Sequence, residues 1–170
     1  MLEFKTPQIE DKLWVDECFK HLKTMNCDYT FGNMFVWSTE YTTKICKYKD
    51  FFICSWGKGD EMSFGIPVGN GDFKDAVNAV KEYTKELGLK LRFYGVTEAY
   101  IDMLNNYFPN EFDFQYDDGY GDYIYSVEKM AELKGKKYHG KRNHISNFKR
   151  NNPNWSFEKI SKDNINECID

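Results

Sequence analysis

Residues 134–150 hold the side chains best suited to binding chemistry. This basic segment contains seven Lys and Arg residues and no Asp or Glu, although the whole chain has a formal net charge of -4. An Arg guanidinium can hold a phosphate through two parallel hydrogen bonds, while a Lys ammonium acts as a point charge. A local cationic patch on an acidic chain favours a specific anionic ligand over general coating of nucleic acid.

The residue spacing in the basic segment predicts one helix over Lys134–Arg150. Its apolar stripe, which would dock the helix, comprises Tyr138, Ile145 and Phe148. A second stripe recurs at steps of three or four residues and is cationic: Lys134, Lys137, Lys141 and His144. Free N–H groups at the start of the helix would also favour phosphate. The alternative is a solvated basic face whose cations pair with acids elsewhere in the chain.

Motifs for other chemistry are missing from the sequence. His139 and His144 are five residues apart and do not share a helical face, so no metal site is predicted. The five cysteines contain no CxxC pair, which favours reduced thiols over a zinc site or a disulfide framework. The glycine-rich turns do not continue into a P-loop or a GxGxxG fingerprint. A run of Asp117, Asp118 and Asp122 predicts an acidic, loop-capping turn, and no catalytic residue is assigned.

The elements that must position the basic segment predict an α+β fold. Amphipathic helices are expected after Thr6-Pro7, from Phe73 to Leu87 and after Thr97. Lys49-Asp50 predicts a tight hairpin between the first two strands. The strand-like runs are Thr43–Tyr48, Phe51–Trp56, Glu61–Ile66, Leu89–Gly95, Phe112–Tyr116, Tyr123–Tyr125 and Trp155–Ile160.

The length of 170 residues suits one domain and the start of another. We expect a first domain over residues 1–160. Residues 161–170 begin a helical pattern that stops after about two turns, which is too short to be stable alone, so we expect them to start a second, truncated domain. The polar N-terminus is no signal peptide, and no apolar run could span a bilayer. The expected location is the cytoplasm, with peripheral contact to the inner membrane face left open.

Two stretches carry a resemblance to a known family. The sequences GDYIYSVEKMAELKGKKYHGKRNHISNFKR at residues 121–150 and FGNMFVWSTEY at residues 31–41 resemble the bacterial family related to the C-terminal domain of phosphatidylglycerol lysyltransferase. The resemblance covers nearly the whole chain. It implies two acetyltransferase-like (GNAT) folds in tandem, the first of which is a mixed, mainly antiparallel sheet flanked by helices. A second GNAT-like domain is thus an expected partner within the same protein.

The resemblance also implies an acyltransferase that moves an amino acid from charged tRNA to a lipid or peptide acceptor. By matching position, the residues expected to contact phosphate are Lys136, Lys137, Lys141, Arg142 and Asn143. His144 and Lys149 are added to these candidates because each lies on the same side of the predicted helix as other cations of the segment. The Q/R-x-x-G-x-G/A pyrophosphate loop of acetyltransferases is not found, which argues against the use of acetyl-CoA by this half of the tandem. Aminoacyl-tRNA is therefore the first expected donor, and acyl-CoA is the alternative.

Two other functions stay open at this point. The chain could be a non-catalytic module that binds a phosphorylated small molecule or RNA through the basic helix. It could also be a structural half-domain whose cations pair with its own acids. The expected partners are therefore tRNA, a phosphorylated small molecule or a membrane lipid.

Overall fold

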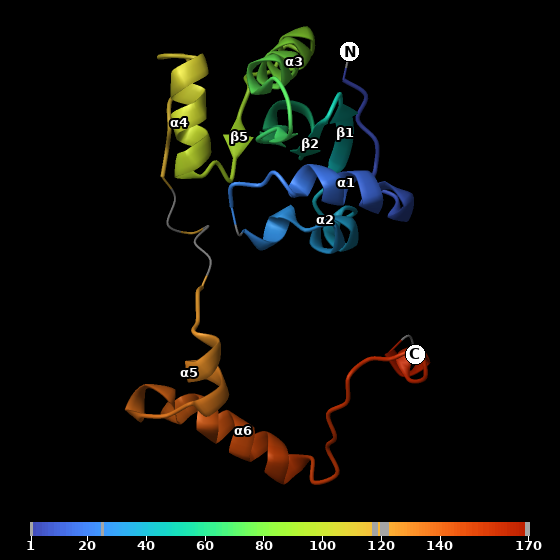
Figure 1. The fold of residues 1–170 in the computed structure, drawn as a ribbon, viewed down its shortest axis with the longest axis vertical. Coiled ribbons are helices and arrows are strands. Elements are labelled where there is room, and N and C mark those ends of the chain that lie inside the picture. The colour runs from blue at the N-terminus through green and yellow to red at the C-terminus, as the bar shows by residue number, and fades with distance from the viewer. Residues whose placement is uncertain (1, 25, 117–118, 120–122, 169–170) are drawn as a thin grey trace. The chain divides into compact units, whose positions relative to one another are not determined.

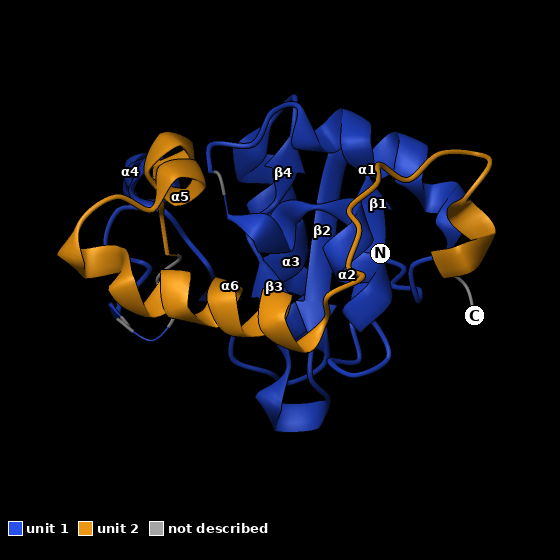
Figure 2. Cartoon of the chain, turned by 90° about the horizontal axis from the view of Figure 1, so that it is seen from below, with its two compact units in different colours: residues 1–122 blue, residues 123–170 orange. Residues whose placement is uncertain are grey.

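Residues 1–122 (unit 1) are built around a β-sheet, and residues 123–170 (unit 2) form a separate, mostly helical body (Figure 2). The computed structural model describes residues 2–24, 26–116, 119 and 123–168. The predicted acidic turn at Asp117, Asp118 and Asp122 lies outside these residues. This division into units does not test the predicted domain boundary after residue 160, which stays a prediction.

The strand β2 (Phe51–Trp56) lies at the centre of the sheet of unit 1 (Figure 1). On one side it pairs antiparallel with β1 (Lys44–Tyr48), and Tyr48 faces Phe51 across the two-residue turn, which confirms the predicted hairpin. On the other side β2 pairs with β3 (Ser63–Gly65) and β4 (Val68–Gly69). The strand β5 (Phe93–Tyr94) extends the sheet by pairing in parallel with β3.

A β-bulge separates β3 from β4. Ser55 pairs with Phe64, whereas Phe52 pairs with Val68, so the chain opposite β2 contains one extra residue between the two pairings. The extra residue falls at Ile66-Pro67, and proline has no N–H to give to a ladder. After the bulge the chain pairs with β2 again as β4, and it leaves the sheet at the end of that strand, before the next helix.

Helices cover both faces of the sheet (Figure 1). On one face, Phe52 and Cys54 of β2 pack with Val15 of α1 (Lys12–Phe19) and Phe31 of α2 (Phe31–Trp37). On the other face, Ile53 packs with Val80 of α3 (Phe73–Glu86). Successive side chains of a strand point to opposite faces, so the uninterrupted apolar run of β2 requires a helical layer on each side.

The helix α4 (Glu98–Tyr107) completes unit 1. Its buried residues Tyr100 and Leu104 pack with Phe73 and Val77 of α3. The helix α3 begins as its sequence predicts, because the side chain of Asp72 accepts a hydrogen bond from the N–H of Asp75 at 3.0 Å. Short 3₁₀-helical turns occupy Ile9–Asp11, Cys27–Tyr29 and Gly59–Glu61.

Unit 2 contains the helices α5 (Val127–Glu132) and α6 (His139–Asn151). A 3₁₀-helical turn at Lys136–Tyr138 leads into α6, and another lies at Ile165–Cys168. Among the described residues of unit 2, only Leu133 is buried. Most apolar side chains of this unit are therefore exposed, including Ile124, Phe157 and Ile160.

The predicted fold class is confirmed: the described residues form an α+β structure with a mainly antiparallel sheet flanked by helices. This arrangement is consistent with a GNAT-like fold. Three predicted strands are wrong, since the runs at 112–116, 123–125 and 155–160 are fully described and form no strand. A strand needs a neighbour for its backbone hydrogen bonds, and these runs have none among the described residues.

Gly69 is required where β4 passes the hairpin. A Cβ at this position would lie 2.0 Å from the carbonyl oxygen of Asp50, so we expect Gly69→Ala to lower the free energy of unfolding by about 1–3 kcal/mol through overpacking. Gly32→Ala is the matched control, because a Cβ on this helical glycine meets nothing within 4 Å. It should leave stability unchanged or raise it by up to about 1 kcal/mol. Urea denaturation measures both changes, and equal effects would contradict the packing described here.

Candidate anion-binding site

The helix α6 begins at His139, five residues later than predicted. The backbone of Leu133 is left-handed, with φ of 50°, and that of Gly135 has φ of 90°. Neither conformation continues a right-handed helix. Lys134 therefore belongs to the connection between α5 and α6, and the prediction of one helix over Lys134–Arg150 is wrong at its first turn.

The predicted cationic stripe is accordingly divided among three parts of the chain. Lys141 and His144 lie on α6, Lys137 lies with Lys136 in the 3₁₀-helical turn before it, and Lys134 lies in the connection after α5. The residues of the stripe remain within five positions of the start of α6. Their cations can still serve one ligand, although a single straight helix face does not align them.

Arg142 has a structural partner that the sequence does not indicate. Its Nη1 donates one hydrogen bond to the carbonyl oxygen of Leu133 and another, of 2.9 Å, to that of Gly135. These carbonyls follow directly after α5, so the half-buried guanidinium caps the C-terminal end of one helix from within the other. Arg142 is thus a positioning residue, and its predicted contact with phosphate stays a prediction.

Three lysines of the basic segment lie over aromatic rings. The ring centroids are 5.4–5.9 Å from the ammonium nitrogens, in the pairs Lys137 with Tyr138, Lys141 with Tyr125, and Lys149 with Trp155. Such cation–π contacts contribute about 0.5–1 kcal/mol at exposed sites. The three lysines are exposed, so their ammonium groups remain accessible to an anion.

The cations of the basic segment are mostly unpaired. Among the described residues, Lys134 forms the one ion pair of this segment, with Glu132 at 3.0 Å. Lys136, Lys137, Lys141 and Lys149 have no carboxylate partner in the described part of the chain. This result gives no support to the alternative in which internal acids neutralise the segment.

Neutral polar groups complete the site. The Nδ2 of Asn143 lies 3.2 Å from the Nε2 of His139, one turn earlier on α6. His144 is exposed, and its imidazole has no hydrogen bond to a described residue. Nothing in the described ranges groups three or more His, Cys, Asp or Glu side chains for a metal ion.

Charge separates the two units of the chain. Unit 2 has ten Lys and Arg residues against six Asp and Glu, while unit 1 has thirteen against twenty-one. The basic segment thus gives its own unit a net positive charge. An anionic ligand would be attracted to unit 2 and repelled by the average charge of unit 1.

Sequence reasoning missed the aromatic partners of the lysines. Tyr125 and Trp155 lie outside the basic segment, at 52% and 45% exposure, so no periodicity of the segment includes them. The nearest signal was the flanking YIY and NPNW runs, in which aromatic side chains border the cations.

The chain belongs to the phosphatidylglycerol lysyltransferase C-terminal family, whose model matches residues 19–170. It is also similar to a conserved protein of unknown function from Bacteroides thetaiotaomicron, solved by crystallography, with 32% sequence identity and a TM-score of 0.79. That likeness covers 99% of this chain and 57% of the solved one. No curated protein matches the chain. None of the helices in the described residues is long and apolar enough to cross a membrane.

The two carbonyl contacts of Arg142 lead to a testable difference between neighbouring cations. Arg142→Ala should lower the hydrogen-exchange protection of amides 140–145 by about tenfold, since hydrogen bonds to charged groups contribute about 1.5–3 kcal/mol. Lys141→Ala removes the same charge one residue away but no backbone contact, and should leave protection unchanged. Equal protection in the two variants would show that Arg142 does not hold the helices together.

Proposed function

We propose that this chain takes part in the transfer of an amino acid from charged tRNA to an amine or hydroxyl of a lipid or peptide acceptor. Membership of the lysyltransferase C-terminal family supports an acyl-transfer role. The observation that carries the proposal is the set of four lysines without carboxylate partners among the described residues, at positions 136, 137, 141 and 149.

The reaction makes modest chemical demands on the protein. The acceptor nitrogen or oxygen attacks the carbonyl carbon of the aminoacyl ester, the ester C–O bond breaks, and the terminal ribose oxygen leaves with the proton that the acceptor loses. The ester is already activated, so the protein contributes mainly positioning and stabilisation of developing charge. Cations that hold the phosphates next to the ester would supply the positioning.

The chemistry of unit 2 suits the single-stranded end of a tRNA. Single strands are bound by cations along the backbone and by aromatic rings that stack on bases. Unit 2 places exposed rings directly beside its lysines, at Tyr125 and Trp155. Acyl-CoA is the second donor that these cations could hold, through its phosphates.

The same lysine–aromatic pairs also favour a second candidate function, a non-catalytic module that binds RNA or a phosphorylated small molecule. Both functions require the same cations, so a binding measurement alone does not distinguish them. A measurement of amino-acid transfer distinguishes them.

The direct test is transfer of a labelled amino acid from charged tRNA. The full-length natural protein that contains this chain is incubated with charged tRNA and with lipid and peptide acceptors, and the labelled product is separated from free amino acid. We expect a labelled lipid or peptide that appears only when the tRNA is charged. Tight binding of tRNA with no product over a broad panel of acceptors would favour the binding module instead.

Removal of the four free lysines should weaken RNA binding in a salt-dependent way. Each phosphate contact to a single strand contributes about 0.7 to the slope of log K against log salt. Replacement of Lys136, Lys137, Lys141 and Lys149 by Ala should therefore make the slope shallower by about 2–3. The control replaces four exposed lysines of unit 1 by Ala: Lys58, Lys74, Lys85 and Lys90. Equal losses in the two variants would mean that net charge alone binds RNA.

A further inference from the structure

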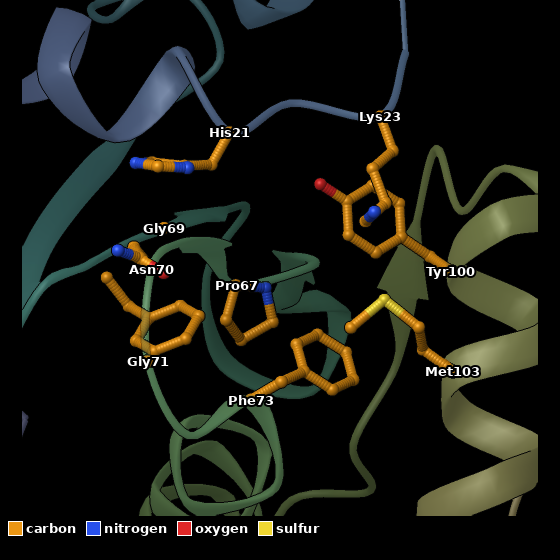
Figure 3. Close-up of a pocket in the computed structure, with 10 residues that line it drawn as sticks. His21, Lys23, Pro67, Gly69, Asn70, Gly71, Phe73, Tyr100 and Met103 are labelled. Atoms are coloured by element: carbon orange, nitrogen blue, oxygen red, sulfur yellow. The ribbon is translucent and has the colours of Figure 1, made fainter.

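Unit 1 contains a cavity of about 230 Å³ that lies apart in sequence from the basic segment (Figure 3). It opens between the connection that follows α1, the turn between β4 and α3, and the side of α4. Its walls include the buried rings of Phe51, Phe73 and Tyr100. Exposed polar side chains lie at its mouth: His21, Lys23 and Asn70.

Two glycines line the cavity, one at the end of β4 and one in the turn that follows. Gly69 lies against the hairpin, where a Cβ would overlap the carbonyl oxygen of Asp50. Gly71 has φ of 139°, and a Cβ there would lie 3.4 Å from the ring of Phe51. Pro67, at the bulge between β3 and β4, also lines the cavity.

The mouth of the cavity is cationic and uncompensated. Within the described ranges, neither Lys23 nor His21 takes part in an ion pair, and the side-chain amide of Asn70 has no hydrogen-bond partner. No acidic residue lines the cavity. The two carboxylates at the start of α3 are engaged elsewhere, because Asp72 caps the helix and Asp75 pairs with Lys49 at 2.6 Å.

The interior of the cavity is uncharged. Burial raises the pKa of the Tyr100 phenol, so this group stays protonated at neutral pH. Phe73 and Met103 add further apolar surface beside it (Figure 3). A cavity that joins these rings to polar groups suits a ligand with an apolar part and a charged head.

We infer that this cavity binds a small organic carboxylate with an apolar body. The body lies against Phe73, Tyr100 and Met103, and the carboxylate lies at the mouth beside the ammonium of Lys23, which is next to the Tyr100 ring (Figure 3). One ammonium group matches a singly charged head group. The volume is below the roughly 300 Å³ at which sites for drug-sized ligands begin, so the ligand is small. This inference concerns unit 1 alone and does not depend on the proposed transfer reaction.

The test is a titration of the ¹⁵N-labelled chain followed by NMR, with benzoate and 4-methylpentanoate as probes. Both carboxylates should shift the amide signals of residues 21–23, 69–73 and 100–103 in a saturable way. Benzamide has the shape of benzoate without the charge and should bind at least about tenfold more weakly. Equal binding of benzamide, tighter binding of phenyl phosphate, or no shift at these residues would overturn the assignment.

Two variants separate the mouth from the interior. Lys23→Ala should weaken benzoate binding by about tenfold, whereas Lys85→Ala, an exposed cation on α3 outside the cavity, should leave it unchanged. Met103→Phe should reduce the space and weaken binding while the remaining spectrum keeps its dispersion. Unchanged affinity in Lys23→Ala would also overturn the inference, because this exposed substitution does not threaten the fold.

Discussion

The strand β2 is the constraint on which the structure of unit 1 depends. Phe51 to Ser55 are all buried, so alternate side chains of this strand need an apolar layer on each side. The helices α1 and α2 supply one layer and α3 supplies the other. The bulge opposite β2 then shifts the pairing by one residue before the chain leaves the sheet after β4.

Unit 2 is organised by polar contacts more than by burial. Leu133 is its one buried side chain among residues 123–168. Arg142 of α6 donates to carbonyl groups at the end of α5 and so connects the two helices. The guanidinium of Arg142 has this structural contact, whereas the ammonium groups of the lysines around it have no hydrogen bond to the described backbone and carry the proposed contact with a ligand. Their contacts with Tyr125, Tyr138 and Trp155 orient them without neutralising them.

Much of the fold could be predicted from local sequence pattern. The hairpin of β1 and β2 follows from two apolar runs separated by Lys49-Asp50, and the start of α3 follows from its Asp72 cap. The strand β4 was missed because two residues are too short for a pattern. The late start of α6 depends on a left-handed Leu133, a conformation that the sequence of a bulky residue does not signal. The cations were predicted from composition, whereas the carbonyl contacts of Arg142 depend on where α5 ends. The cavity brings together residues 21–103, and no local pattern connects them.

The central claim is that the free lysines of unit 2 contact the phosphates of an acyl donor. The most direct measurement is the rate at which each lysine reacts with an amine-modifying reagent, residue by residue, with and without charged tRNA. We predict that tRNA slows the reaction of Lys136, Lys137, Lys141 and Lys149 and leaves the exposed lysines of unit 1 unchanged. Protection confined to unit 1, or spread equally over the chain, would contradict the claim.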